Sequence, residues 1–242
     1  MKYIYLIIIL SFFSMRVFSQ PIILYQGNNE MLNLYDLKTM TFHRLDSNAF
    51  GKLVGYQLKT DSLKCFFEIR GNITTKLYVH SLLSKVIPYP IQMNPSYEFT
   101  HARTRQFNFD DFQLLINGHW LKLLKNDQLI WSTTESAQID SSIYSFLFGY
   151  SYPQISPLYD DILVESIDSR MFTGGHNQLY EFDFKTGTRK SIAKGKNASY
   201  SSDGHYILYR DNFYVYFYVR DRFTNKNIDV LNGAISAFWI YR

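Results

Sequence analysis

An acidic turn followed by a stiff apolar run recurs along this 242-residue chain, and it constrains the fold more than any other feature. The turn acids are Asp61, Asp111, Asp161 and Asp203, at spacings of 50, 50 and 42 residues. The apolar run at 22–25 adds a fifth unit without the acid. Periods of this length are typical of β-propeller blades, in which each unit is one small antiparallel sheet.

Each run is followed by segments that have the composition of further strands. Polar, tight turns such as 185–188, with Gly187, separate these segments and indicate antiparallel hairpins. We expect a third strand in each unit at 42–45, 86–91, 128–132, 189–193 and 228–231. We expect a strand that leads into the next unit at 53–58, 99–105, 143–150 and 198–200.

The two ends of the chain complement each other. The segment 234–241 resembles a lead-in strand but has no unit after it, and the first unit has no lead-in strand. Pairing them would complete the first blade and leave no open edge between the first and last blades. We therefore predict an all-β protein, a propeller of four-stranded antiparallel blades, with five blades closed by the C-terminal strand.

The composition agrees with this fold class. A hydrophobic share of 46% with 19% charged residues indicates a globular chain, and 20 Tyr and 20 Phe favour pleated sheets. Without Lys2 and Arg16 the formal charge falls from +4 to +2, and no basic cluster is present, which argues against nucleic-acid binding. The single Cys65 cannot form an internal disulfide.

The N-terminus has the three regions of a secretory signal peptide. Lys2 is followed by the apolar run 4–13, and the small residue Ser19 marks a cleavage site before Gln20. The apolar run is short for a bilayer span and Arg16 follows it, so an uncleaved anchor is the weaker alternative. We expect residues 1–19 to be removed and residues 20–242 to form one secreted or periplasmic domain with no membrane span.

Three segments resemble the TolB-like β-propeller repeat, in which a strand ending in Asp-x-x-Thr-Gly is followed by Trp-Ser-Pro-Asp-Gly and an apolar strand. They are LYDLKT at 34–39, LYEFDFKTG at 179–187 and SSDGHYILY at 201–209. Tyr200 stands where that family has Trp, and Ser202 where it has Pro. The resemblance implies an extracytoplasmic propeller whose commonest role is protein interaction, and it implies no catalytic residues.

The turn acids invite an interpretation as metal ligands or acid/base groups. Equivalent positions in successive blades lie far apart, however, and an Asp side chain at a turn is explained by bonds to its own backbone. A glycosidase would need two carboxylates at one end of the central channel, for which the candidates are Asp110, Asp160, Glu165 and Asp168. The histidines show no zinc-binding spacing, so we predict no metal and no cofactor.

Two sets of residues are candidates for binding. His101, Arg103 and Arg105 alternate along one expected strand and could hold an anion, although a solvated strand face explains them more simply. Tyr150 and Tyr152 end a row of alternating aromatics next to Pro153 and could reach the rim. The simpler explanation of that aromatic row is a core between neighbouring blades.

The sequence thus favours a monomeric, non-catalytic interaction module that recognises a protein or a cell-envelope component through one rim. The alternative is a carbohydrate-active enzyme with a carboxylate pair at the channel mouth. A third possibility is a structural module of a larger envelope assembly. The sequence does not identify the partner.

Overall fold

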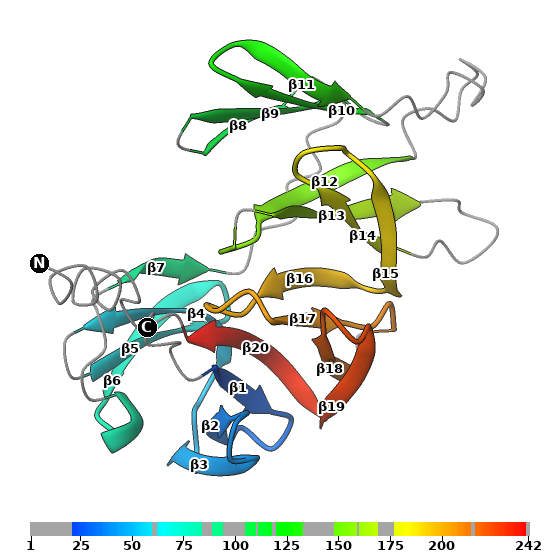
Figure 1. The fold of residues 1–242 in the computed structure, drawn as a ribbon. Helices are drawn as coiled ribbons and strands as arrows, with labels where there is room; N and C mark the ends of the chain where they lie inside the picture. The colour runs from blue at the N-terminus through cyan, green and yellow to red at the C-terminus, as the bar shows by residue number, and fades with distance from the viewer. Residues whose placement is uncertain are drawn as a thin grey trace, which may run out of the picture.

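A computed structural model describes residues 21–59, 62–83, 89–93, 105–109, 111–117, 120–132, 148–158, 160–168, 177–213 and 216–240. These residues form five four-stranded antiparallel sheets, here numbered 1 to 5 in chain order (Figure 1). Sheet 1 contains β1 (Ile22–Gly27), β2 (Leu32–Asp36), β3 (Thr41–Asp46) and β20 (Ala234–Ile240). The prediction of an all-β propeller-type fold with four-stranded blades is confirmed.

The other four sheets follow in chain order. Sheet 2 contains β4 (Lys52–Lys59), β5 (Ser62–Ile69), β6 (Asn72–Tyr78) and β7 (Tyr89–Met93). Sheet 3 contains β8 (Arg105–Phe109), β9 (Phe112–Asn117), β10 (Trp120–Lys125) and β11 (Gln128–Ser132). Sheet 4 contains β12 (Phe148–Ile155), β13 (Asp161–Asp168), β14 (Gln178–Asp183) and β15 (Arg189–Lys194). Sheet 5 contains β16 (Lys196–Tyr200), β17 (Tyr206–Arg210), β18 (Tyr216–Asp221) and β19 (Lys226–Asn232).

The C-terminal strand completes the first sheet, as the sequence predicts. β20 pairs antiparallel with β1, with Ile22 opposite Ile240 and Leu24 opposite Phe238. Trp239 on β20 donates its indole N–H to the Ser199 carbonyl of sheet 5 at 3.0 Å, and its own carbonyl accepts the Tyr56 hydroxyl of sheet 2. One strand therefore ties three sheets together.

Sheet 2 departs from the prediction. The expected third strand at 86–91 would lie outside β6, whereas β7 pairs with β4 on the opposite edge of the sheet. The short 3-10 helix η1 (Ser81–Leu83) follows β6 and buries Leu83 in the core between sheets 1 and 2. Between β6 and β7 the chain thus passes from the outer edge of the sheet to its inner edge. Pro90 within β7 also lacks the N–H that a ladder needs.

Two predicted lead-in strands lie only partly within the described residues. Of the expected segment 99–105 the structure describes only Arg105, the first residue of β8, whose last residue Phe109 pairs with Phe112 across a tight turn. Of the expected segment 143–150 it describes 148–150, which begin β12, and β12 extends to Ile155. In both sheets the innermost strand consists of the residues directly before the turn acids, because a short turn can only join adjacent strands.

A repeated turn shapes sheets 1, 4 and 5 at one end. Asp36, Asp183 and Asp221 each accept backbone N–H bonds from the residues two and three positions later, at 2.6 to 3.4 Å. The residue after each Asp donates its own N–H to the preceding part of the same sheet: Leu37 to Pro21, Phe184 to Asp160 and Arg222 to His205. These turns bury Leu37, Phe184 and Arg222.

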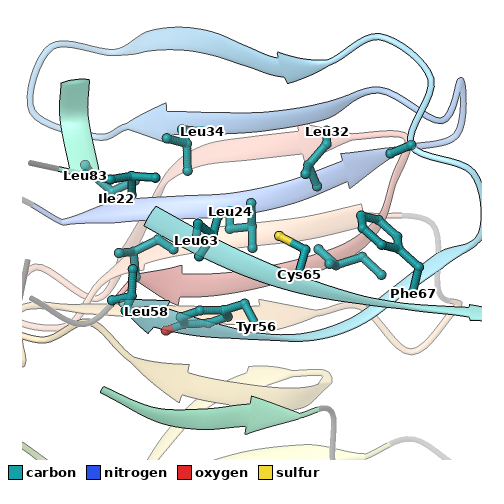
Figure 2. Close-up of a cluster of buried hydrophobic side chains, with 13 residues drawn as sticks. Ile22, Leu24, Leu32, Leu34, Tyr56, Leu58, Leu63, Cys65, Phe67 and Leu83 are labelled. Atoms are coloured by element: carbon teal, nitrogen blue, oxygen red, sulfur yellow. The ribbon is translucent and has the colours of Figure 1, made fainter. Parts of the chain in front are cut away.

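Four buried clusters join the sheets pairwise. They lie between sheets 1 and 2 (Figure 2), between sheets 1 and 5, between sheets 3 and 4, and between sheets 4 and 5. Among the described residues no such cluster joins sheet 2 to sheet 3, and Figure 1 shows these two sheets at opposite ends of a curved array. The latch by β20 is present, but in this part of the chain the ring is not closed.

Burial along the strands agrees with this order of stacking. β1 and β2 in sheet 1 are buried at almost every residue, since sheets pack on both of their faces. β5 in sheet 2 alternates between buried and partly exposed residues because the described part of the chain covers only one of its faces. Lys64 and Glu68 on β5 lie on the uncovered face, where a closed ring would have to bury them.

Candidate functional site

The most concentrated group of ionisable side chains surrounds Arg222, whose side chain is 3% exposed. The Arg222 Nε donates to Glu181 at 2.7 Å, and Nη1 donates to the Ser156 hydroxyl at 3.1 Å. Nη2 donates to Asp160 at 2.9 Å and also to Asp161. The Arg222 cluster, as we call this group, therefore links sheet 5 to three carboxylates of sheet 4.

The Arg222 side chain occupies a position that apolar residues occupy in two other sheets. Leu37 and Phe184 follow the Asp of the same turn and pack into the core of the preceding sheet. The backbone carbonyls of Phe184 and Arg222 also each accept a hydrogen bond from a side chain of a neighbouring sheet. Trp131 Nε1 donates to the Phe184 carbonyl at 2.9 Å, and Lys190 Nζ donates to the Arg222 carbonyl at 3.0 Å. Sheet 4 thus surrounds the Arg222 side chain with carboxylates, whereas the corresponding Leu37 and Phe184 side chains are surrounded by apolar residues.

Glu181 lies at the centre of the Arg222 cluster and is 2% exposed. The Tyr200 hydroxyl donates to Glu181 Oε1 at 2.9 Å, and Lys190 Nζ lies 3.6 Å from Oε2. The Arg222 guanidinium also lies over the Tyr200 ring, with its carbon 5.3 Å from the ring centroid. A buried carboxylate with this many donors is well compensated for the water it has lost.

The two aspartates of the cluster differ in pKa. Hydrogen bonds from Arg222 and Ser156 outweigh partial burial and hold the pKa of Asp160 below its usual value. Burial raises the pKa of Asp161 to about 6, helped by the nearby Glu181, although Arg222 opposes the shift. The carboxylates raise the pKa of Arg222 in spite of its burial, so it stays charged at any physiological pH.

A second polar group lies at the other end of the same interface. Glu165 on β13 is 2% exposed and accepts the Asn197 backbone N–H at 3.1 Å and an amide N–H from Asn177. Burial raises the pKa of Glu165 to about 7, while these bonds and the charge of Lys196 act to lower it. Asn177 and Asn212 also bond each other, which joins the ends of sheets 4 and 5.

These carboxylates are poorly arranged for acid/base catalysis. Asp161 and Glu165 lie four residues apart on one strand, about 13 Å along the backbone, which is wider than the spacing of about 5 to 9.5 Å that glycosidases use. Asp160, Asp161 and Glu181 converge, but the Arg222 guanidinium fills the space between them. No group of three metal-ligating side chains occurs in the described ranges.

The side chains of the two remaining candidates for the glycosidase alternative, Asp110 and Asp168, lie outside the described part of the chain. Asp110 lies outside the described residues, and Asp168 is the last residue of β13, with its side chain outside the description. Among the turn acids, Asp203 bonds locally as predicted, accepting the Ser201 hydroxyl and the His205 N–H. The Asp161 carboxylate instead accepts a hydrogen bond from Arg222 across the interface between sheets 4 and 5. This corrects the prediction that the acid bonds the backbone of its own turn.

The predicted binding residues are not brought together in the described part of the chain. His101 and Arg103 lie outside it, and Arg105 is the first residue of β8. Tyr150 lies opposite Ser166 within β12, and Tyr152 lies at a bulge of that strand between Ser151 and Gln154. Both tyrosines thus belong to a strand rather than to an exit loop, and their side chains lie outside the description.

Sequence analysis missed Arg222, Glu181 and Asn177. A signal for Arg222 was present, because aligning the turns 36–39, 183–186 and 221–224 places an arginine where two sheets have Leu and Phe. A buried arginine requires acidic neighbours, which this alignment could have prompted us to seek.

No protein-family model matches the chain, and no curated protein matches it. Solved structures do resemble it. A candidate 6-phosphogluconolactonase from Bacteroides fragilis is 13% identical over 91% of this chain and 70% of its own, with a TM-score of 0.37. A β-propeller domain from Myceliophteria thermophila is 11% identical over 85% of this chain and 81% of its own, also with a TM-score of 0.37. At these values no activity is taken from either protein.

Among the described residues no helix is both long and apolar enough to span a bilayer. The predictions of secretion, of a monomer and of a protein partner stay predictions.

Proposed function

We propose that the chain is a non-catalytic interaction module that acts outside the cytoplasm and binds a protein or a cell-envelope component. The observation that carries this proposal is the pair of sheet faces, one at each end of the stack, that no other sheet of the described residues covers. In sheet 2 this face contains Phe66, Ile73 and Leu77, and in sheet 3 it contains Leu124 and Leu129. Apolar side chains on an uncovered sheet are typical of a surface that a partner covers.

The candidate chemical groups support the same proposal. Arg222 donates hydrogen bonds to Asp160, Asp161 and Glu181 and so joins sheet 5 to sheet 4. Such a network stiffens the joint between two blades, which a binding scaffold needs in order to hold its surface in shape. The predicted signal peptide and the resemblance to the TolB-like repeat favour an extracytoplasmic location for this module.

A carbohydrate-active enzyme is the second candidate, because a buried carboxylate with a pKa of about 7 could exchange protons near neutral pH. Glu165 is 2% exposed, so this candidate requires an opening that brings substrate to it.

Two experiments on the purified mature chain separate the candidates. Immobilised protein incubated with solubilised envelope extract should retain a partner that rebinds after purification with 1:1 stoichiometry. The same protein should release no reducing sugar from a panel of polysaccharides. Polysaccharide hydrolysis that is lost in Glu165→Gln would favour the enzyme over the binding module.

Signal-peptide cleavage is tested separately. The N-terminal sequence of exported protein should begin at Gln20, and retention of residues 1–19 would contradict cleavage.

A further inference from the structure

One edge of sheet 2 differs from the corresponding edge of every other sheet. In sheets 1, 3, 4 and 5 the third strand from the inner edge pairs with a fourth strand on its outer side: β3, β11, β15 and β19. In sheet 2 that third strand is β6, and the fourth strand, β7, lies on the opposite edge beside β4. Within the described residues no strand pairs with the outer edge of β6.

The hairpin that joins β5 to β6 determines which backbone groups face this edge. Arg70 and Gly71 have φ values of 49° and 80°, as a two-residue type I′ turn requires, and Ile69 pairs with Asn72 across it. In such a hairpin the flanking pair exchanges both hydrogen bonds, and bonded pairs then alternate along the strands. The N–H and C=O groups of Ile73, Thr75 and Leu77 therefore point away from β5, toward the outer edge.

The side chains of these residues share one face. Ile73 and Leu77 are 51% and 59% exposed, and they lie opposite Glu68 and Lys64 on the uncovered face of the sheet. The other face of β6 is anchored. The Lys76 ammonium and the Tyr78 hydroxyl both bind Asp46 of sheet 1, at 3.2 and 2.8 Å. The edge is thus held in a fixed position beside an apolar surface.

We propose that the outer edge of β6 receives an extended segment of a partner protein as an additional strand. The segment bonds the backbone of Ile73, Thr75 and Leu77 and places alternate apolar side chains beside Ile73 and Leu77. In the other four sheets a fourth strand of the chain itself pairs at this position, so the added strand would give sheet 2 the same outer pairing. This inference rests on the proposed function and specifies its surface and the form of the partner.

Two other occupants are less suitable. The next strand of this chain, β7, is already paired with β4. A second copy could pair through its own β6, but two short strands bury less than the roughly 1,000 Å² that a stable dimer needs. A flexible peptide, unlike a folded copy, can also cover the adjoining face.

The test is a matched pair of substitutions at the centre of the edge. Thr75→Pro removes the outward N–H without removing a bond to β5, since proline is tolerated at such edge positions. Thr75→Val keeps the N–H and the branched shape of the side chain. The probe is a fluorescein-labelled decapeptide that alternates valine with threonine and glutamate, and fluorescence anisotropy reports its binding. A version methylated on alternate backbone nitrogens is the peptide control.

We expect binding to Thr75→Val within twofold of wild type, and binding at least tenfold weaker to Thr75→Pro and to the methylated peptide. Hydrogen exchange of unsubstituted protein, which is independent of how the proline variant folds, should slow at Ile73, Thr75 and Leu77 when the decapeptide is added. Absence of decapeptide binding, equal binding to both variants or protection elsewhere would overturn the proposal.

The competing occupants give distinct results. Slow exchange of the same three amides without peptide would assign the edge to the chain itself. A dimer that Thr75→Pro dissociates in sedimentation would assign it to a second copy. Each of these results overturns the proposal. If the proline variant still retains the envelope partner as wild type does, the interaction module stands and only its assignment to β6 fails.

Discussion

At the scale of the residue, Arg222 shows how one substitution changes the character of an interface. Its counterparts Leu37 and Phe184 gain stability by burying apolar area, whereas Arg222 depends on three acidic partners. A buried ion pair adds little stability over an apolar pair of the same shape, but loss of one partner leaves an uncompensated charge. The cluster therefore makes sheets 4 and 5 more specific for each other than it makes them stable.

Replacing Arg222 by Met should lower the free energy of unfolding by about 3–5 kcal/mol, because Glu181 and Asp161 lose their buried cation. Chemical denaturation of purified protein measures this change. Arg220→Met, two residues earlier on β18, is the matched control, since Arg220 donates to Asn225 and Asn227 at exposed contacts, and it should cost less than about 1 kcal/mol. Equal costs for both variants would contradict a special role for Arg222.

Glu165 should make stability depend on pH. Its pKa is about 7 in the folded protein and about 4.5 in an unfolded chain, so its protonated form is favoured on folding. The resulting stabilisation is fully present below pH 4.5 and is lost as the pH rises through 7. Asp161, with a pKa of about 6, acts in the same direction, whereas the lowered pKa of Asp160 acts only in more acidic solution.

Urea denaturation from pH 5 to pH 8 should therefore show a stability that falls by on the order of 3 kcal/mol or less. Glu165→Gln keeps an acceptor for the Asn197 N–H and should flatten most of this dependence. A variant with the same pH profile as wild type would show that Glu165 ionises no differently in the folded state.

At the scale of the element, β20 contributes more than one strand to one sheet. It covers β1 and carries Trp239, which is buried between sheets 1 and 5. Deleting residues 234–242 should expose the edge of β1 and abolish cooperative thermal unfolding, with increased binding of a hydrophobic dye. Deleting only Tyr241 and Arg242 leaves β20 whole and should shift the midpoint by a few degrees at most. A cooperative transition in the larger deletion would contradict the latch.

Strands differ in how their two faces are covered. β1, β2 and the central part of β13 are buried on both faces, whereas β5 is buried on one. The sequence indicates the difference, since Ile22-Ile23-Leu24 is continuously apolar, whereas the face of β5 opposite Leu63, Cys65 and Phe67 includes the charged Lys64 and Glu68. A strand between two sheets must be apolar on both faces, and a strand in a terminal sheet only on one.

At the scale of the whole molecule, the stacking order runs from sheet 3 through sheets 4, 5 and 1 to sheet 2 (Figure 1). We expect native-state hydrogen exchange to be slowest in sheets 1, 4 and 5, which are packed on both faces, and faster in sheets 2 and 3. Mass spectrometry of exchanged peptides resolves these regions. Uniform protection of all five sheets would indicate a closed ring, because opening free energies follow the local burial of each unit.

Sequence patterns alone predict five units, most of their strands and the pairing of the two chain ends. The units and strands follow from local turn chemistry and from a period-two pattern that repeats at nearly constant spacing, and the pairing follows because each chain end lacks a strand that the other can supply. Three features required the three-dimensional contacts: β7 joins the inner edge of sheet 2, Arg222 meets Asp160, Asp161 and Glu181, and sheets 2 and 3 each have a face that no other described residues cover. Those outcomes depend on which groups from distant segments can be buried together, and a pattern along the sequence does not show which of these segments will pack against each other.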